Sequence, residues 1–160
     1  MTANLNAETL SFPSFQIEIQ DDWERSIDNR PVDDLLSMIS LRRPNGVGVL
    51  KIGFYDTRAV VSEDALRNLT NLDFSIPLTW QSWGDYSGYQ YDYSESGSFF
   101  RPWWLTNEGT IIVVTYQCDP ESKDIETEEI DNIVRSIVTT PVLKRSESVE
   151  LSDYHRIRGE

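Results

Sequence analysis

The chain has 160 residues, of which 39% are hydrophobic and 11% aromatic, enough for one packed domain and too many for a disordered protein. Its 14 Lys and Arg residues against 27 Asp and Glu residues give a formal net charge of −13, a sign that repels nucleic acid and anionic lipid. The aliphatic run at 111–114 is far shorter than the roughly 20 residues of a membrane helix. One Cys and one His leave no disulfide framework and no Cys- or His-rich metal site.

The N-terminal part of the chain predicts a strand followed by a hairpin. Apolar and polar residues alternate at 15–19, and the turn that follows ends in Trp23, which we expect in the core. The second half of 32–41 predicts a strand that pairs with 47–54, because the Pro-Asn-Gly sequence between them favours a turn. One face of the second hairpin strand carries Val47, Val49 and Lys51.

A helix is predicted after the hairpin. Ser62 is a good N-cap, and the next two residues are acidic, which suits the positive end of the helix dipole. The apolar stripe of this helix consists of Ala65, Leu66, Leu69 and Leu72.

The stretch from 76 to 118 predicts a meander of four strands, at 78–83, 89–93, 99–105 and 111–118. The last of these strands is apolar on both faces, which is typical of a sheet that is covered on both sides. We therefore expect burial on one face for Ile112, Val114 and Tyr116, and substantial burial on the other for Ile111, Val113 and Thr115.

A second helix closes the predicted domain. Its apolar stripe runs through Ile130, Ile133, Val134, Ile137 and Val138. Asp124 or Thr127 would cap its start, and Pro141 would end it. Residues 1–141 are thus expected to form a single globular domain, and the charged residues 142–160 a mobile tail. The N-terminus has no basic start and no apolar h-region, so a cytoplasmic protein is expected.

This order of elements resembles the PsbP-like fold. The opening strand and Asp22-Trp23 look like the first strand and the Pro-x-x-Trp turn of that group, here without the proline. Further likeness lies in the segments 88–91, 101–105, 112–118 and 133–137, and the resemblance covers about residues 14–139. It implies an α+β protein in which an antiparallel sheet of six to seven strands is covered by helices on both faces, as an α/β/α sandwich. The fold is shared with a photosystem II extrinsic subunit, a Ran-binding nuclear import factor and adaptors for type VI secretion effectors.

The residues that commonly carry catalysis are sparse. The lone histidine, His155, lies in the expected tail, and Cys118 ends an apolar strand with no base nearby, so neither is expected to be catalytic. The acidic residues at 119–131 lack the spacing of a calcium loop and fit a helix N-terminus better. Gly46-Val47-Gly48 continues into a strand, which excludes a dinucleotide-binding turn. We expect no enzymatic activity, no cofactor and no metal.

Ten aromatic residues fall within 80–104, and two roles are open for them. Aromatic pairs across strands stabilise a sheet, so a core role is the first reading. The second is a binding surface near the turns at 84–88 and 94–98, because Tyr86 is predicted in a turn and the consecutive Trp103 and Trp104 face opposite sides of a strand. Residues expected to bind a partner under the second reading are Tyr86, Arg101, Trp103 and Trp104.

The function predicted first is that of a cytoplasmic, non-catalytic binding protein with a protein partner, either as an immunity protein or as a secretion-effector adaptor. The acidic charge favours a basic partner, such as a toxin or a secreted effector, although it also serves solubility alone. The alternative is a small-ligand binder with an aromatic pocket between sheet and helix.

Overall fold

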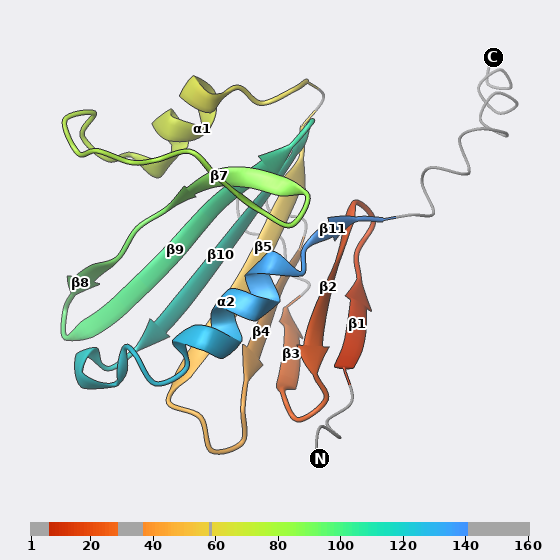
Figure 1. The fold of residues 1–160 in the computed structure, drawn as a ribbon, viewed down its shortest axis with the longest axis vertical. Coiled ribbons are helices and arrows are strands. Elements are labelled where there is room, and N and C mark those ends of the chain that lie inside the picture. Colours follow the sequence, from red (N-terminus) through yellow and green to blue (C-terminus); the bar gives the residue numbers. More distant parts are fainter. Residues whose placement is uncertain (1–6, 29–36, 58, 141–160) are drawn as a thin grey trace, which may run out of the picture.

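The structure is a computed structural model that describes residues 7–28, 37–57 and 59–140 (Figure 1). The predicted tail at 142–160, its boundary at 141 and His155 lie outside the described residues. Within them, the chain forms two antiparallel sheets and two α-helices.

The larger sheet has eight strands. Its order is β3 (Glu24–Asp28), β4 (Ser37–Arg42), β5 (Gly48–Asp56), β10 (Thr110–Cys118), β9 (Ser98–Asn107), β7 (Tyr86–Gln90) and β6 (Gln81–Trp83), and β8 (Tyr93–Glu95) also pairs with β9. The predicted hairpin is confirmed as β4 and β5, which pair antiparallel with Met38 opposite Gly53. The predicted strand at 78–83 is shorter than expected, because only its last three residues pair.

The smaller sheet has three strands, in the order β1 (Ala7–Ser11), β2 (Phe15–Gln20) and β11 (Val138–Thr139). The opening strand predicted at 15–19 is confirmed as the middle one. Its apolar residues Phe15, Ile17 and Ile19 are all buried, as the alternating pattern requires.

Both predicted helices are present. In α1 (Glu63–Thr70) the Ser62 hydroxyl accepts a hydrogen bond of 3.0 Å from the Ala65 N–H, so the predicted N-cap is confirmed. The second helix, α2 (Thr127–Arg135), follows the short 3-10 helix η2 (Pro120–Ser122). Its N-cap position is held by Glu126, whose side chain turns inward and does not cap the helix.

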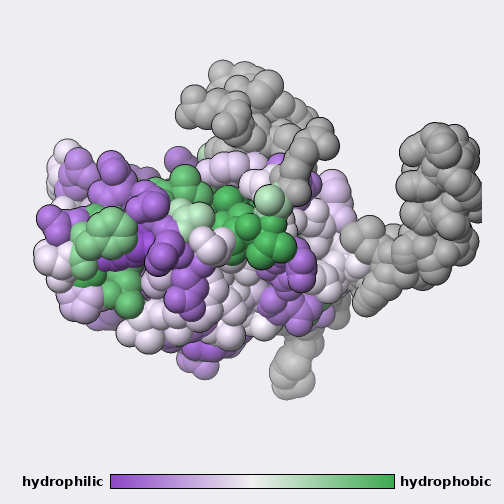
Figure 2. All heavy atoms as spheres, turned by 90° about the horizontal axis from the view of Figure 1, so that it is seen from above, coloured by the Kyte–Doolittle hydropathy of each residue, from purple (hydrophilic) through white to green (hydrophobic). Residues whose placement is uncertain are grey.

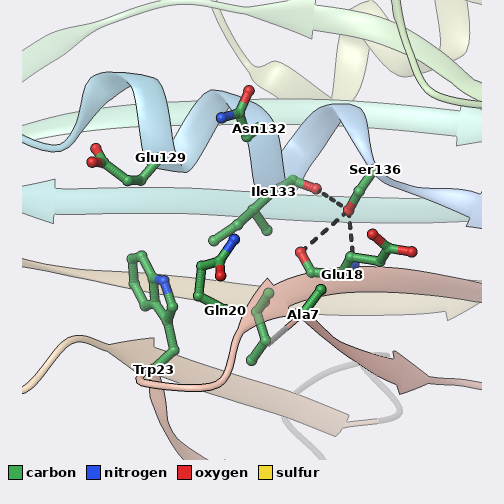
Figure 3. A pocket seen from close by; sticks show the side chains of 9 residues that line it. Ala7, Glu18, Gln20, Trp23, Glu129, Asn132, Ile133 and Ser136 are labelled. Carbon is green, nitrogen blue, oxygen red and sulfur yellow. Dashed lines mark hydrogen bonds between the residues drawn. The ribbon is translucent and has the colours of Figure 1, made fainter. Parts of the chain in front are cut away.

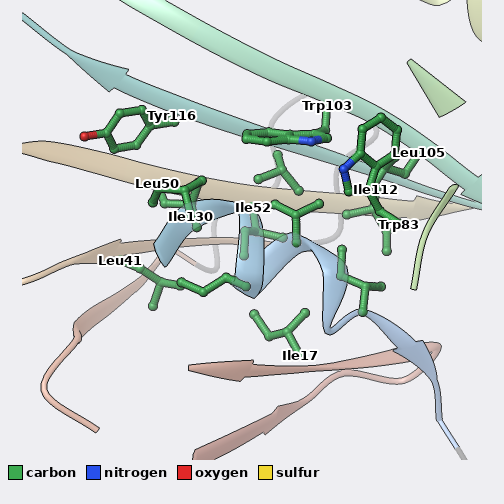
Figure 4. Close-up of a cluster of buried hydrophobic side chains, with 14 of the residues drawn as sticks. Ile17, Leu41, Leu50, Ile52, Trp83, Trp103, Leu105, Ile112, Tyr116 and Ile130 are labelled. Carbon is green, nitrogen blue, oxygen red and sulfur yellow. The ribbon is translucent and has the colours of Figure 1, made fainter. Parts of the chain in front are cut away.

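The main core lies where α2 meets both sheets (Figures 1 and 4). Ile130 of α2 packs among Ile17 of β2, Ile52 of β5 and Trp103 of β9. On this face of the large sheet Ile112, Val114 and Tyr116 are fully buried, as predicted. The other face holds Ile111, which is buried, and Val113 and Thr115, which are half-buried.

The expectation of six to seven strands is not confirmed, because the described residues form eleven strands in two sheets. Full helical cover of both faces is not confirmed either. We call the face that packs on α2 the inner face and the opposite one the outer face. On the outer face α1 contacts β7 and β9, where Leu66 joins Tyr89 and Ile111 in a second apolar cluster. Away from α1, no helix among the described residues covers the outer face.

Neither α1 nor α2 is long and apolar enough to cross a membrane, and no other helix of the described residues is.

Candidate functional site: a trough on the outer face of the sheet

Tyr86 lies in strand β7, and its expected place in an exposed turn is wrong. The side chain is 1% exposed, and its ring packs edge-on to Phe15 at 6.3 Å between centroids. The turn before it is held against the short segment between α2 and β11, because the Asp85 N–H donates to the Ile137 carbonyl at 2.9 Å. Burial also raises the pKa of the Tyr86 hydroxyl to about 12.

Trp103 and Arg101 also belong to the inner face. Trp103 is 3% exposed within the core, so a role as an exposed anchor is excluded. Arg101 pairs with Asp92 at 2.9 Å and lies over the Phe99 ring at 5.1 Å. Its Nη1 also donates to the Thr127 hydroxyl at 3.3 Å, so the guanidinium joins β9 to the start of α2.

Trp104 points to the outer face, as the alternation along β9 requires. It is half-buried, and its Nε1–H donates to the Tyr91 hydroxyl at 3.1 Å. The four residues predicted to bind a partner therefore do not form one patch. Tyr86, Arg101 and Trp103 lie on the inner face, and of the four only Trp104 lines this hollow in the outer surface.

That hollow has a volume of about 380 Å³ and lies across five strands of the outer face. Register explains its shape. Trp104, Val113, Gly53 and Met38 stand opposite one another in one cross-strand row, and Gly53 contributes no side chain at its middle. The lining residues are Met38, Lys51, Gly53, Tyr55, Tyr93, Phe100, Trp104, Val113, Thr115 and Gln117.

One wall of the hollow is a pair of aromatic rings. Tyr93 stacks on Phe100 with centroids 5.0 Å apart and ring planes 17° apart, and Tyr93 keeps 41% of its surface exposed. Tyr93 belongs to β8, which pairs with the same edge of β9 as β7 does. The break between β7 and β8 lies opposite Pro102, which has no N–H to donate to a ladder.

A second hollow of about 320 Å³ continues the first along β4, β5 and β10, and the two share Lys51 and Gln117. The second hollow is polar, and its lining consists of Ser40, Arg42, Val47, Gly48, Val49, Lys51, Ser98, Gln117, Cys118 and Asp119. We call the two together the trough. It is aromatic and aliphatic at the Trp104 end and carries two exposed cations, Lys51 and Arg42, toward the other end.

The sequence did not single out Lys51, Tyr55 or Phe100 as site residues. Lys51 had a signal, because it is the one charged residue in an otherwise apolar strand pattern. A lysine that faces Thr115 across the ladder, in the middle of a large sheet, marks a face that is open to water.

A further pocket of about 150 Å³ lies between α2 and β2 (Figure 3). Here the Ser136 hydroxyl accepts from the Glu18 N–H at 2.8 Å and donates to the Ile133 carbonyl at 2.6 Å, which joins the end of α2 to the small sheet. The pocket is small, and the Ser136 hydroxyl on its wall is engaged in holding these elements together. We therefore regard it as a gap in the packing between α2 and the small sheet and not as a binding site.

Cys118 and Glu126 are also engaged in the fold. Burial raises the pKa of the Cys118 thiol, whose Sγ donates to the Asp119 carbonyl at 3.2 Å, so the thiolate is disfavoured. Glu126 is buried and accepts a hydrogen bond of 2.7 Å from the Tyr116 hydroxyl. The described residues hold no group of three or more His, Cys, Asp or Glu side chains that could bind a metal ion.

Exposed apolar residues occur outside the trough as well. Seen from above, hydrophobic side chains gather at the α1 end of the molecule, among hydrophilic ones (Figure 2). The large hydrophobic residues exposed on α1 and its flanking loops are Val60, Leu69, Phe74 and Ile76.

No protein-family model matches the sequence, and no curated protein does. Among solved structures, the fold is similar to that of a Bacteroides thetaiotaomicron protein, with a TM-score of 0.57 and 13% identity over 79% of this chain; the chain spans 45% of that protein's length. It is also similar to cyanobacterial PsbP from Synechocystis, with a TM-score of 0.47 and 9% identity over 88% of this chain and 95% of that one. The third structure is LpqN of Mycobacterium tuberculosis, with a TM-score of 0.42 and 14% identity over 86% of this chain and 92% of that one. At these identities the comparisons concern the fold alone, and of the three only the Bacteroides structure has a TM-score above 0.5.

Proposed function

We propose that this chain is a non-catalytic binding protein and that its binding site is the trough, which takes a small ligand. The observation that carries the proposal is the hollow beside Trp104. Ligand sites are concave, mostly apolar and about 300–1,000 Å³ in volume, with a few polar groups that fix orientation. The hollow meets each condition, with a volume of about 380 Å³ and four aromatic residues in its lining.

The site differs in place from the one predicted between sheet and helix. Side chains fill the space under α2, where Ile130 and Trp103 are buried. The outer face is open because its middle row contains Gly53 and its next row places Lys51 and Thr115 side by side. A ligand in the trough would cover aromatic surface that is now half-exposed, and this burial would drive binding.

The test is titration with phenylnaphthylamine, an uncharged aromatic probe whose fluorescence rises in apolar sites. We expect saturable binding at one site per chain. Thr115→Phe adds a ring in the middle of the trough and should weaken binding at least about tenfold, whereas Gln81→Phe adds the same ring on the edge strand β6 and should leave binding unchanged. Unsaturable binding, or equal binding by both variants, contradicts the proposal.

A protein partner, of the immunity or secretion-adaptor kind expected from the resemblance, is the second candidate. It is favoured by the exposed apolar residues Leu69, Phe74 and Ile76 beside α1, since exposed hydrophobic patches mark interaction sites. The net charge of −13 would speed encounter with a basic partner. A photo-crosslinking residue at position 74 should then capture a defined partner, and Leu69→Ser with Ile76→Ser should abolish the capture. A crosslink that survives both substitutions speaks against this surface.

A further inference from the structure

We infer that the ligand of the trough is an amphipathic monoanion, with an aromatic or aliphatic body and one acidic group such as a carboxylate or a sulfonate. This inference rests on the proposed function, which names the site but not the chemistry of its ligand. It is carried by the division of the trough into an apolar end and a cationic end.

The apolar end sets the shape of the body. Trp104 forms its floor beside Val113, and the stacked rings of Tyr93 and Phe100 form its wall. Flat aromatic surfaces favour offset or edge-on packing with another ring or with methylene groups. The Trp104 Nε1–H is already donated to Tyr91, so the indole offers the ligand its face and not a polar group.

The cationic end sets the charge. Lys51 and Arg42 are exposed, and neither forms an ion pair with any residue that the structure describes. Asp and Glu outnumber Lys and Arg by 27 to 14 in the whole chain, whereas the lining of the second hollow contains two cations and one carboxylate. A ligand acid at this end would meet both cations.

The remaining lining residues limit the ligand to about one negative charge. Asp119 lines the second hollow together with Lys51 and Arg42, and Glu24, which is not among the lining residues, stands opposite Arg42 on β3, so carboxylates offset part of the positive charge. Ser40, Ser98, Thr115 and Gln117 add uncharged hydrogen-bonding groups around Lys51. A dianion such as a phosphate monoester would carry more negative charge than the cations of the trough balance. The negative potential of the acidic protein would then repel the second charge.

The experiment compares two probes with the same aromatic body. Anilinonaphthalene sulfonate carries one negative charge, and phenylnaphthylamine carries none. We expect the full chain to bind the sulfonate about five- to tenfold more tightly, since two exposed charge pairs each contribute a few-fold in affinity. Lys51→Gln should weaken sulfonate binding about three- to fivefold and leave phenylnaphthylamine binding unchanged, and Arg42→Gln should act in the same way.

Lys123→Gln is the matched control, because Lys123 is exposed outside the trough and should affect neither probe. Urea midpoints equal to that of the parent chain establish that the variants remain folded. Two outcomes would overturn the monoanion inference while the proposed site stands. One is equal affinity for the two probes, and the other is a sulfonate affinity that neither Lys51→Gln nor Arg42→Gln changes. Failure of both probes to bind would overturn the proposed site as well.

Discussion

Glu126 is a carboxylate that is 1% exposed, at the point where α2 begins. Its Oε1 accepts from the Tyr116 hydroxyl at 2.7 Å, and its Oε2 lies 3.5 Å from Nη1 of Arg43. A Cβ added at Gly46 would come within 2.5 Å of that same Oε2, so the β4–β5 turn also closes over the carboxylate. One buried side chain thereby joins α2, β10 and the hairpin turn, which explains why it does not serve as a helix cap.

Tyr116→Phe should lower the free energy of unfolding by about 1–3 kcal/mol, because it leaves a buried carboxylate with one hydrogen bond fewer. Urea denaturation measures the change. Tyr93→Phe removes the same hydroxyl from an exposed ring and should change the free energy by less than about 0.5 kcal/mol. Equal effects of the two substitutions would show that the Glu126 contact contributes nothing.

Alkaline pH should destabilise the protein through its buried tyrosines. Burial raises the pKa of Tyr86 from 10.0 to about 12, and burial and the neighbouring Glu126 raise the pKa of Tyr116 further. Between pH 10 and 12 the unfolded chain therefore releases protons that the folded chain keeps. The stabilisation present below pH 10 is lost as the pH rises, with a slope of up to about 1.4 kcal/mol per pH unit for each group. Tyr86→Phe should reduce this slope in urea titrations at successive pH values, and an unchanged slope would exclude Tyr86 as a cause.

At the scale of elements, the turn between β6 and β7 contacts the segment that follows α2 and leads into β11. Gly84 has φ of +61°, and a Cβ there would lie 1.9 Å from the Ile137 carbonyl oxygen. The Asp85 carboxylate also accepts a hydrogen bond of 2.9 Å from the Thr139 N–H of β11. Gly84 and Asp85 are solvent-exposed, as their sequence suggests, but one side of the turn backbone is in close contact with Ile137.

Gly84→Ala should lower the free energy of unfolding by more than about 3 kcal/mol, because it adds a steric clash to the strain of a positive φ. Gly97→Ala provides the control, since Gly97 has φ of +83° with nothing within 4 Å of its added Cβ. That change should cost about 1–2 kcal/mol through backbone strain alone. Thermal and urea unfolding of the pair separate the two contributions, and equal losses would contradict the close contact between Gly84 and Ile137.

The sequence predicted the long strands well and the short or polar ones poorly. Strands β5 and β10 have clear apolar patterns, whereas β1 and β3 are short and mostly polar, so their pairing depends on neighbours that periodicity does not reveal. Gly88 misled the prediction of β7, because glycine is typical of turns. Here it lies within the strand, where an added Cβ would come 1.8 Å from the Trp104 carbonyl oxygen.

At the scale of the whole molecule, the aromatic residues divide between the two faces of one sheet. Tyr86 and Trp103 fill the core, as the first of the two predicted roles requires, and Trp104 lines the trough, where a binding role stays a prediction. The sequence could not assign them, because the trough forms from five strands whose register is set by tertiary pairing. Tyr93 and Met38 lie 55 positions apart in the chain, and only the order of strands brings them to one surface.

The two sheets should unfold together, because one apolar cluster contains residues from both sheets and from α2. Ile17 of the small sheet is fully buried in it, so Ile17→Ala should lower the free energy of unfolding by about 2–4 kcal/mol without splitting the transition. Far-ultraviolet circular dichroism and tryptophan fluorescence should give the same urea midpoint in both proteins. Separate midpoints for the two signals would mean that the sheets are independent units.

The pairing of β11 with β2 also bears on how the chain folds during synthesis. Val138 pairs with Gln16, so the small sheet is complete only after nearly all of the described chain has been made. Contacts between such distant residues slow folding, since a long loop must close before they form. Until α2 and β11 emerge from the ribosome, the apolar side of β2 that carries Phe15 and Ile17 lacks its cover. The nascent chain would therefore expose aggregation-prone surface until late in translation, and a chaperone that holds it there would raise the yield of folded protein.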